Sequence, residues 1–266
     1  MPYLCRLTPN PIMTLSKNRI KYIHSLELKK NRDAEGIFLA EGPKLVGELL
    51  NSFPCTFLAA TPAWRSRNPQ ALAEEFVEVT EEELARASLL KTPQQVLALF
   101  RKKNATTGKD EIARSLCLAL DGVQDPGNLG TIIRLADWFG IRHIFCSPDT
   151  ADAYSPKAVQ ATMGSLARVA LHTTDLSTLI RSLPHGTPVY GTFLDGENMY
   201  QKELTNNGLL IMGNEGRGIR DEVGQLVNQR LYIPAYPQER GGTESLNVGV
   251  ATAIVCAEFR RQAAKL

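Results

Sequence analysis

The second half of the chain alternates short apolar runs with stretches in which apolar residues recur at helical spacing. Short continuous apolar runs are typical of strands that are buried on both faces. Their alternation with helices predicts a parallel sheet covered on both sides. We expect the strands at residues 116–120, 143–146, 189–192, 209–212 and 231–233.

The N-terminal part shows a different mixture of elements. Apolar residues recur at helical spacing between basic ones over residues 16–30, which predicts an amphipathic helix. Pro43 suits the first turn of a second helix, and Thr80 with Glu83 forms a capping-box pattern at the start of another. Short strands are expected at residues 36–40, 56–60, 77–79 and 96–100. Together these elements predict a small α/β domain.

A polar stretch over residues 101–110 separates the two parts. It opens with three basic residues and continues with Asn, Thr and Gly, which is the composition of a linker. We therefore place a domain boundary there. The prediction is an N-terminal domain over residues 1–107 and a C-terminal domain over residues 108–266.

Charge changes this picture only at the N-terminus. The chain of 266 residues is 43% hydrophobic with a net charge of +2, which fits a folded protein with buried cores. Residues 1–32, however, carry seven Lys or Arg and a single acid, Glu27. This basic arm could bind phosphates or be a solvated helix face, and charge alone leaves both interpretations open. Its basic residues are Arg6, Lys17, Arg19, Lys21, Lys29, Lys30 and Arg32.

Cysteine and histidine give no sign of a disulfide framework or a metal centre. The five cysteines are an odd, scattered set without C-x-x-C spacing, and the four histidines show no ligand spacing. No signal-peptide pattern opens the chain, and no uncharged apolar stretch is long enough to cross a membrane. We therefore expect a cytoplasmic protein that binds no metal.

Three short segments carry the candidate chemistry. Residues 128–134 are N-L-G-T-I-I-R, residues 213–218 are G-N-E-G-R-G, and residues 245–248 are S-L-N-V. In this order they resemble the motifs of the SpoU (TrmH) family of RNA 2'-O-ribose methyltransferases, a branch of the SPOUT superfamily. Each motif occurs once, at the expected place, and the resemblance covers most of the C-terminal domain.

The resemblance implies a fold, a cofactor and an assembly. Enzymes of this family pass their C-terminal segment through a loop and form a deep trefoil knot, although knots are very rare among proteins. Here the knotted part is expected from residue 209 onward, with residues 247–261 as the threaded helix. The family uses S-adenosylmethionine and pairs through its knotted domains, so we expect a homodimer through the C-terminal domain. The N-terminal domain resembles the family's RNA substrate-binding domain.

The resemblance also assigns parts to individual residues. Arg134 is expected to bind the target phosphate, while Glu215 braces the active site near Asn128 or Arg134. The expected catalytic residues are Arg134, Asn128, Glu215, Ser245 and Asn247. The expected donor-binding residues are Thr192, Phe193, Leu194, Gly213, Ile233 and Leu246.

Other interpretations of some residues stay open. Asn128 alone is compatible with a plain helix start, Arg134 with a surface arginine, and Ser245 with an ordinary N-cap. The family's motif arginine has been proposed as the base, but an arginine pKa above about 12 favours phosphate binding over proton abstraction. Two features depart from the family pattern: Gly249, where serine is frequent, and the long glycine-rich connection over residues 235–244.

The predicted activity is methyl transfer from S-adenosylmethionine to a ribose 2'-hydroxyl in RNA. An accessory N-terminal domain favours 23S ribosomal RNA as the substrate, with tRNA as the alternative. A second alternative is an RNA-binding protein that keeps the fold without catalysis, but intact Asn128, Arg134 and Glu215 argue against it. A Rossmann-type oxidoreductase is disfavoured because no G-x-G-x-x-G follows the first strand of either domain.

Overall fold

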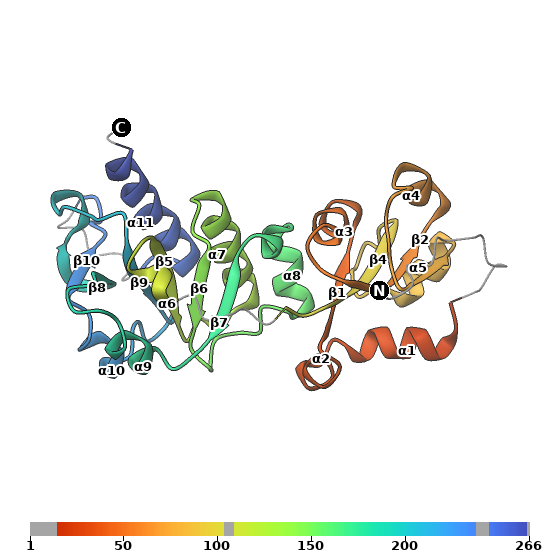
Figure 1. Cartoon of the computed structure of the whole chain (residues 1–266), viewed down its shortest axis with the longest axis horizontal. Coiled ribbons are helices and arrows are strands. Elements are labelled where there is room, and N and C mark those ends of the chain that lie inside the picture. The colour runs from red at the N-terminus through yellow and green to blue at the C-terminus, as the bar shows by residue number, and fades with distance from the viewer. Residues whose placement is uncertain (1–14, 104–108, 238–244, 265–266) are drawn as a thin grey trace. The chain divides into compact units, whose positions relative to one another are not determined.

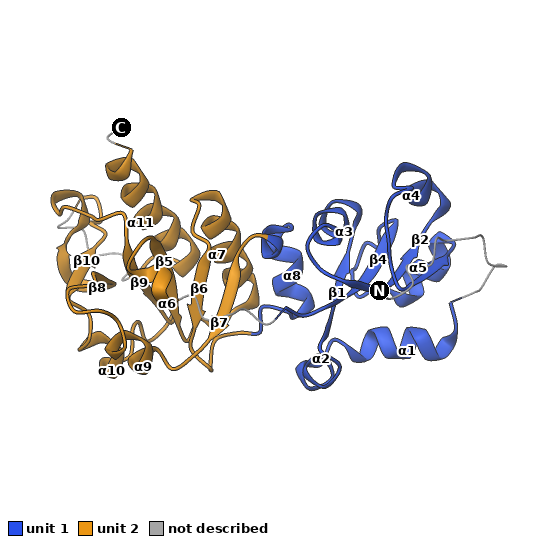
Figure 2. Ribbon diagram, in the orientation of Figure 1, with its two compact units in different colours: residues 1–104, 152–167 blue, residues 105–151, 168–266 orange. Residues whose placement is uncertain are grey.

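The structure is a computed structural model that describes residues 15–103, 109–237 and 245–264. Arg6 of the basic arm and most of the connection over residues 235–244 lie outside the described residues. The chain forms two compact units (Figure 2). Unit 1 contains residues 1–104 and 152–167, and unit 2 contains residues 105–151 and 168–266.

Unit 1 is built on a four-stranded mixed sheet in the order β1–β4–β2–β3 (Figure 1). Strand β4 is antiparallel to β1 and β2, whereas β2 and β3 are parallel. Its strands are β1 (Ile37–Glu41), β2 (Cys55–Ala60), β3 (Glu75–Glu78) and β4 (Val96–Arg101). Its helices are α1 (Lys17–Ser25), α2 (Lys29–Glu35), α3 (Pro43–Leu50), α4 (Pro62–Arg67), α5 (Glu81–Ala87), α8 (Pro156–Thr162) and the 3-10 turn η1 (Ser165–Ala167). The predicted small α/β domain is thus present.

The predicted helix over residues 16–30 is wrong in its extent, because a turn separates α1 from α2. The buried Arg32 side chain donates hydrogen bonds to the carbonyls of Leu26 and Glu27, at 2.6 and 2.7 Å. Those two carbonyls accept hydrogen bonds from a buried guanidinium at the end of α1. Apolar periodicity carries no information about such a contact. The predicted start of α3 at Pro43 and the predicted capping box at the start of α5 are both confirmed.

Residues 152–167 come from the second half of the sequence but pack in unit 1. Arg32 is only 2% exposed and donates to the Asp152 carboxylate through Nε at 3.1 Å and Nη2 at 2.6 Å. The Tyr154 ring lies 5.0 Å from the Phe38 ring, centroid to centroid. The compact units therefore do not coincide with a single cut in the sequence. The functional division into residues 1–107 and 108–266 stays a prediction.

Unit 2 is built on a six-stranded sheet in the order β10–β8–β9–β5–β6–β7, and every pair of neighbours is parallel. Its strands are β5 (Leu116–Asp121), β6 (His143–Cys146), β7 (Ala170–Thr173), β8 (Val189–Asn198), β9 (Gly208–Gly213) and β10 (Gln229–Tyr232). Its helices are α6 (Lys109–Ile112), α7 (Pro126–Trp138), α9 (Leu176–Arg181), η2 (Met199–Gln201), α10 (Asp221–Gly224) and α11 (Val248–Ala263). The predicted parallel α/β sheet is confirmed, and the edge strand β7 was missed.

Strand β5 lies at a switch in the topology of this sheet. The chain continues from β5 to β6 and β7 on one side, and later places β9 on the other side of β5. In open parallel sheets, ligands bind outside the carboxyl ends of the strands at such a point. The carboxyl ends of β5 and β9 are Asp121 and Gly213, which are register partners.

The last helix, α11, packs against α7 and β9 (Figure 1). At one end of this pair, the Thr131 methyl group lies 3.4 Å from where a Cβ on Gly249 would stand. At the other end, Arg260 Nε donates a hydrogen bond of 2.6 Å to the Phe139 carbonyl. The helix expected over residues 247–261 therefore exists. Its threading through a knot stays a prediction.

Candidate active site

The glycine-rich motif forms a tight loop directly after β9. Asn214 and Gly218 exchange two backbone hydrogen bonds of 2.9 Å each. A Cβ on Gly213 would lie 2.3 Å from the carbonyl carbon of Gly218, far closer than real atoms approach. Position 213 therefore requires glycine, because the loop folds back directly over it.

The asparagine motif begins helix α7 beside the end of β5. The N-cap of α7 is Asp125, whose carboxylate accepts a hydrogen bond of 2.9 Å from the Asn128 backbone N–H. Pro126 occupies the first turn, where its missing N–H costs nothing. Because Asp125 supplies the cap, the Asn128 side chain is available for other contacts.

A line of hydrogen bonds joins the three motifs. Asn128 Nδ2 donates to Glu215 Oε1 at 2.9 Å, and Asn247 Nδ2 donates to Asn128 Oδ1 at 3.0 Å. Asn247 is also the N-cap of α11, since its Oδ1 accepts from the backbone N–H groups of Gly249 and Val250. Segments that are far apart in the sequence therefore meet at one edge of the sheet. Ser245 is not the N-cap of α11.

Hydrogen bonding keeps Glu215 in its charged form. Burial raises the pKa of Glu215, but the Asn128 side chain and backbone N–H groups that include those of Gln124 and Asp125 outweigh it and lower the pKa. A carboxylate held by several donors is a weak base. The contacts fit a bracing acid rather than a proton acceptor.

Arg134 and Ser245 differ from this line of hydrogen bonds. Both are exposed, and neither has a hydrogen-bond partner within residues 15–103, 109–237 and 245–264. Arg134 lies one helical turn after Thr131, the residue of α7 that approaches α11. Its guanidinium is therefore presented to solvent on the helix that also carries Asn128.

Most of the expected donor-binding residues lie at the carboxyl ends of three neighbouring strands. Gly213 ends β9, and Ile233 directly follows β10. In β8, Gly191 pairs with Arg230 of β10 and Glu197 with the next residue, so residues 192–196 form a wide bulge outside this pairing. Thr192, Phe193 and Leu194 are part of that bulge.

The Phe193 side chain faces the interior of unit 2 and does not line the sheet edge. Its ring packs against the hydrophobic core, and a Cβ on Gly191 would lie 2.6 Å from a ring carbon. The Arg230 guanidinium carbon lies 3.5 Å from the ring centroid, and Arg230 also pairs with Asp195. Only the Phe193 backbone is available to a ligand at this edge.

These residues fit a nucleoside with an apolar and a polar side. Leu194 and Leu246 are exposed and supply the apolar side. The bulge and the Gly213 turn let a ligand approach the backbone closely and offer it polar backbone groups.

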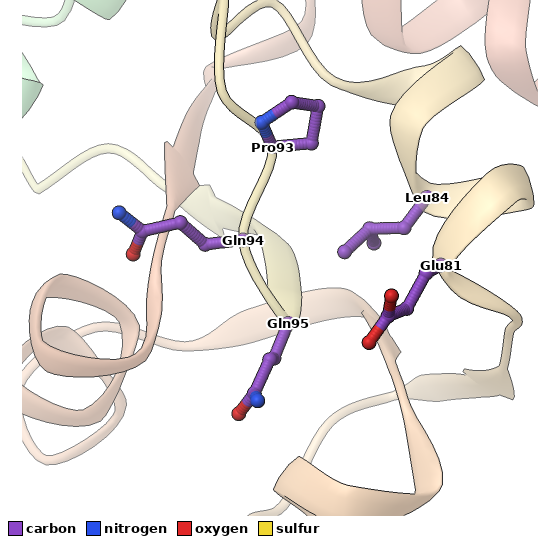
Figure 3. A pocket seen from close by; sticks show the side chains of 5 residues that line it. All are labelled: Glu81, Leu84, Pro93, Gln94 and Gln95. Carbon is purple, nitrogen blue, oxygen red and sulfur yellow. The ribbon is translucent and has the colours of Figure 1, made fainter.

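A cavity of about 140 Å³ in unit 1, between Leu84, Pro93 and Gln95, is smaller than the roughly 300 Å³ of small ligand pockets (Figure 3).

The sequence did not single out the charged cluster behind the loop. Asp121, buried at the end of β5, accepts hydrogen bonds from Arg220 directly after the loop. The only signal was an acid and a glycine closing an otherwise apolar strand.

Within the described residues, no group of His, Cys, Asp or Glu could hold a metal ion. In the same part of the chain, no helix is long and apolar enough to span a membrane.

Comparison with known proteins agrees with this geometry. The profile of the SpoU rRNA Methylase family matches residues 115–257, and that of the MRM3-like substrate binding domain matches residues 17–98. The chain belongs to the SpoU rRNA methylase family. The predicted S-adenosylmethionine-dependent RNA methyltransferase is thereby confirmed at the level of the family, and the Rossmann alternative is wrong.

Individual relatives of this SpoU protein match almost their full length. The Bacillus subtilis 23S rRNA (guanosine(2553)-2'-O)-methyltransferase RlmP is 33% identical over 94% of this chain and 98% of its own. A TrmH-family RNA methyltransferase structure from Porphyromonas gingivalis is 44% identical, with a TM-score of 0.83 over 94% of this chain and 100% of its own. The AdoMet-bound rRNA methyltransferase structure from Sinorhizobium meliloti is 30% identical, with a TM-score of 0.81 over 94% and 97%.

Proposed function

We propose that this protein transfers a methyl group from S-adenosylmethionine to a ribose 2'-hydroxyl of 23S rRNA. The observation that carries the proposal is the line of hydrogen bonds from Glu215 through Asn128 to Asn247, which joins all three SpoU motifs at the switch point of the sheet. A guanosine is the target nucleotide, by similarity to the full-length relative RlmP.

Bound S-adenosylmethionine supplies an electrophilic methyl group at the carboxyl edge of the sheet. The backbone of residues 192–194, Gly213 and Ile233 would hold it there, and the exposed Leu246 side chain would cover its apolar part. This assignment is supported by the exposure of apolar groups around a turn that only glycine can form.

Arg134 holds the phosphate of the target nucleotide and stays a cation throughout the reaction. Its exposure and its lack of a partner within the described parts of α7 and its neighbours leave two parallel N–H donors for a phosphate. As the 2'-oxygen takes the methyl group, its proton passes to solvent and the donor leaves as S-adenosylhomocysteine. The cation stabilises negative charge that develops on the 2'-oxygen. Glu215 fixes Asn128, Asn128 and Asn247 set the floor of the site, and Ser245 contacts the RNA or the donor.

Unit 1 binds the RNA. Within its basic arm, Arg32 is buried against Asp152, and Arg19 pairs with Glu75 and stacks on Phe57. Those two arginines therefore serve the fold. Among the described residues of the arm, the exposed basic ones are Lys17, Lys21, Lys29 and Lys30. These lysines are the proposed phosphate contacts.

The C-terminal helix threads through a trefoil knot, and the protein works in the cytoplasm as a homodimer. Support for the dimer comes from neighbouring α7 and α11, which present apolar side chains to solvent. Trp138 on α7 is 83% exposed and Val250 on α11 is 49% exposed. A second copy of the same face would bury both residues in an isologous interface.

Methyl transfer from tritiated S-adenosylmethionine to unmodified 23S rRNA and to tRNA tests the proposal directly. We expect label at one ribose of 23S rRNA and none in tRNA, and we expect the same site to lose its 2'-O-methyl group in a deletion strain. Label in tRNA alone would select the tRNA alternative. If neither RNA is labelled while both bind, the protein is the non-catalytic RNA-binding alternative.

A further inference from the structure

We propose that Arg220, together with Asp121, is a positioning residue that clamps the Gly213–Gly218 loop and so sets Glu215 against Asn128. The inference rests on the proposed function, because it assigns a role in the same reaction. Neither residue belongs to the three motifs. Both touch the base of the loop rather than its tip.

Three N–H groups of Arg220 contact the Asp121 carboxylate at short distances. The Asp121 carboxylate accepts from the Arg220 backbone N–H at 2.8 Å, from Nε at 2.7 Å and from Nη2 at 2.6 Å. The Asp121 side chain is 0% exposed. A buried carboxylate that accepts three N–H groups from one residue fixes both the backbone and the side chain of that residue.

The position of Arg220 shows that its side chain does not cap helix α10. Arg220 is the N-cap of α10, where Ser, Thr, Asp or Asn normally accepts a hydrogen bond from the first turn. A guanidinium has no acceptor, and Arg220 makes no side-chain cap. The residue at this position therefore serves the contact with β5.

The other end of the loop is tied to the next residue of the chain after Asp121. Asn214 Nδ2 donates to the Gly122 carbonyl at 2.7 Å, while the Gly122 N–H donates to Ser147 Oγ at 2.8 Å. Ser147 in turn donates to Asp149 at 2.6 Å. Both ends of the loop are thus fixed on two consecutive residues, and Glu215 lies between those ends.

The surroundings of Arg220 argue against a direct contact with RNA. Besides Asp121, the carboxylates of Asp149 and Glu222 lie 3.9 and 3.6 Å from its guanidinium nitrogens. Three acids around one cation leave no net positive charge for a phosphate. Arg134 and Arg217, in contrast, are exposed, and their side chains make no hydrogen bond or ion pair in the described ranges.

Arg220→Lys tests the clamp, because a lysine keeps the charge but cannot make the forked contact. The matched control is Arg168→Lys, which alters a similar forked pair with Asp137 on the surface of unit 2. We expect Arg220→Lys to lower kcat by about 10- to 100-fold, as small misplacements in active sites do, with KM for RNA within about twofold. Arg168→Lys should leave both constants unchanged.

Two further readouts separate positioning from other roles. Amide hydrogen exchange at residues 214–218 should accelerate in Arg220→Lys and not in the control. In a Glu215→Gln background, Arg220→Lys should cause little additional loss of kcat, since both changes act through the same contact. Additive losses, or a loss of kcat with unchanged exchange, would overturn the proposal. Should wild-type protein methylate no RNA, the proposed reaction fails, while the exchange result still decides whether Arg220 clamps the loop.

Discussion

Two parts of the candidate active site are held in different ways. Asn128, Glu215 and Asn247 hold one another through side-chain hydrogen bonds before any ligand arrives. Arg134 lies on the same helix as Asn128 but is exposed, without a partner in the described part of the chain. The first part is a preorganised floor, whose cost of ordering is met during folding. The second is a charge that has no counterpart until RNA binds.

The largest expected effect is on the exposed part. Arg134→Ala should lower methyl transfer by about 100-fold or more, because a phosphate contact at the reacting nucleotide is lost. Donor affinity, measured by calorimetry, and the midpoint of thermal unfolding should stay unchanged, since no described residue makes a hydrogen bond or ion pair with the Arg134 side chain. Arg134→Lys should recover little. Arg142→Ala, an exposed arginine before β6, is the control; equal losses in donor binding would place Arg134 at the donor instead.

A change in the preorganised part should affect stability as well as activity. Asn128→Ala removes the link between Glu215 and Asn247, so the free energy of unfolding should fall by about 1–2 kcal/mol. Methyl transfer should fall by about 10-fold, measured in single turnover. Asn207→Ala, which loses one surface hydrogen bond to Ala113, is the control for stability. Wild-type stability in Asn128→Ala would show that the line of hydrogen bonds does not form in solution.

Smaller effects are expected at Ser245 and Asn247, the two polar residues of the S-L-N-V motif. Asn247→Ala should cost about 1 kcal/mol, because it removes the N-cap of α11. Ser245→Ala should change the free energy of unfolding by less than about 0.5 kcal/mol, since no described residue bonds to it. Its methyl transfer should fall by about threefold to tenfold, the equivalent of one neutral hydrogen bond. Urea denaturation of both variants separates the roles.

The smallest effect concerns pH. Because hydrogen bonds lower the pKa of Glu215 in the folded state, this residue stabilises the protein above its unfolded pKa. That contribution is lost in the acid range, as pH falls through the lowered folded value. Unfolding of Glu215→Gln should therefore depend less on pH in the acid range than unfolding of wild type. In the neutral range, kcat should show no titration of Glu215; an inflection that vanishes in Glu215→Gln would make it a general base.

The sequence predicted the parts of the site that depend on local pattern. Apolar runs located five of the six strands in unit 2, and the motif order predicted which strand ends carry chemistry. Strand β7 was missed because His172 and Thr173 make up half of its four residues and dilute its apolar pattern. The predicted helix over residues 16–30 failed for a different reason, since the carbonyls at the end of α1 bond to the side chain of Arg32, which apolar periodicity does not reveal.

Contacts between residues far apart in the sequence explain the features that could not be predicted. The clamp of Asp121 on Arg220 joins residues that are 99 positions apart, and no pattern in either segment announces it. The sequence pattern did not predict the direction of the Phe193 ring either. A bulge in β8 reverses the alternation of its side chains, and the bulge is visible only in the pairing with β10.

The packing of residues 152–167 in unit 1 has a consequence for the growing chain. Arg32 and Phe38 leave the ribosome early, whereas Asp152 and Tyr154, their partners, emerge more than a hundred residues later. At about 5–20 residues per second, this interval lasts on the order of ten seconds. Throughout it, the nascent N-terminal unit carries a cation without its acidic partner and a Phe38 ring without one of its aromatic neighbours. The N-terminal unit therefore cannot finish folding until residues 105–151 of unit 2 have been translated.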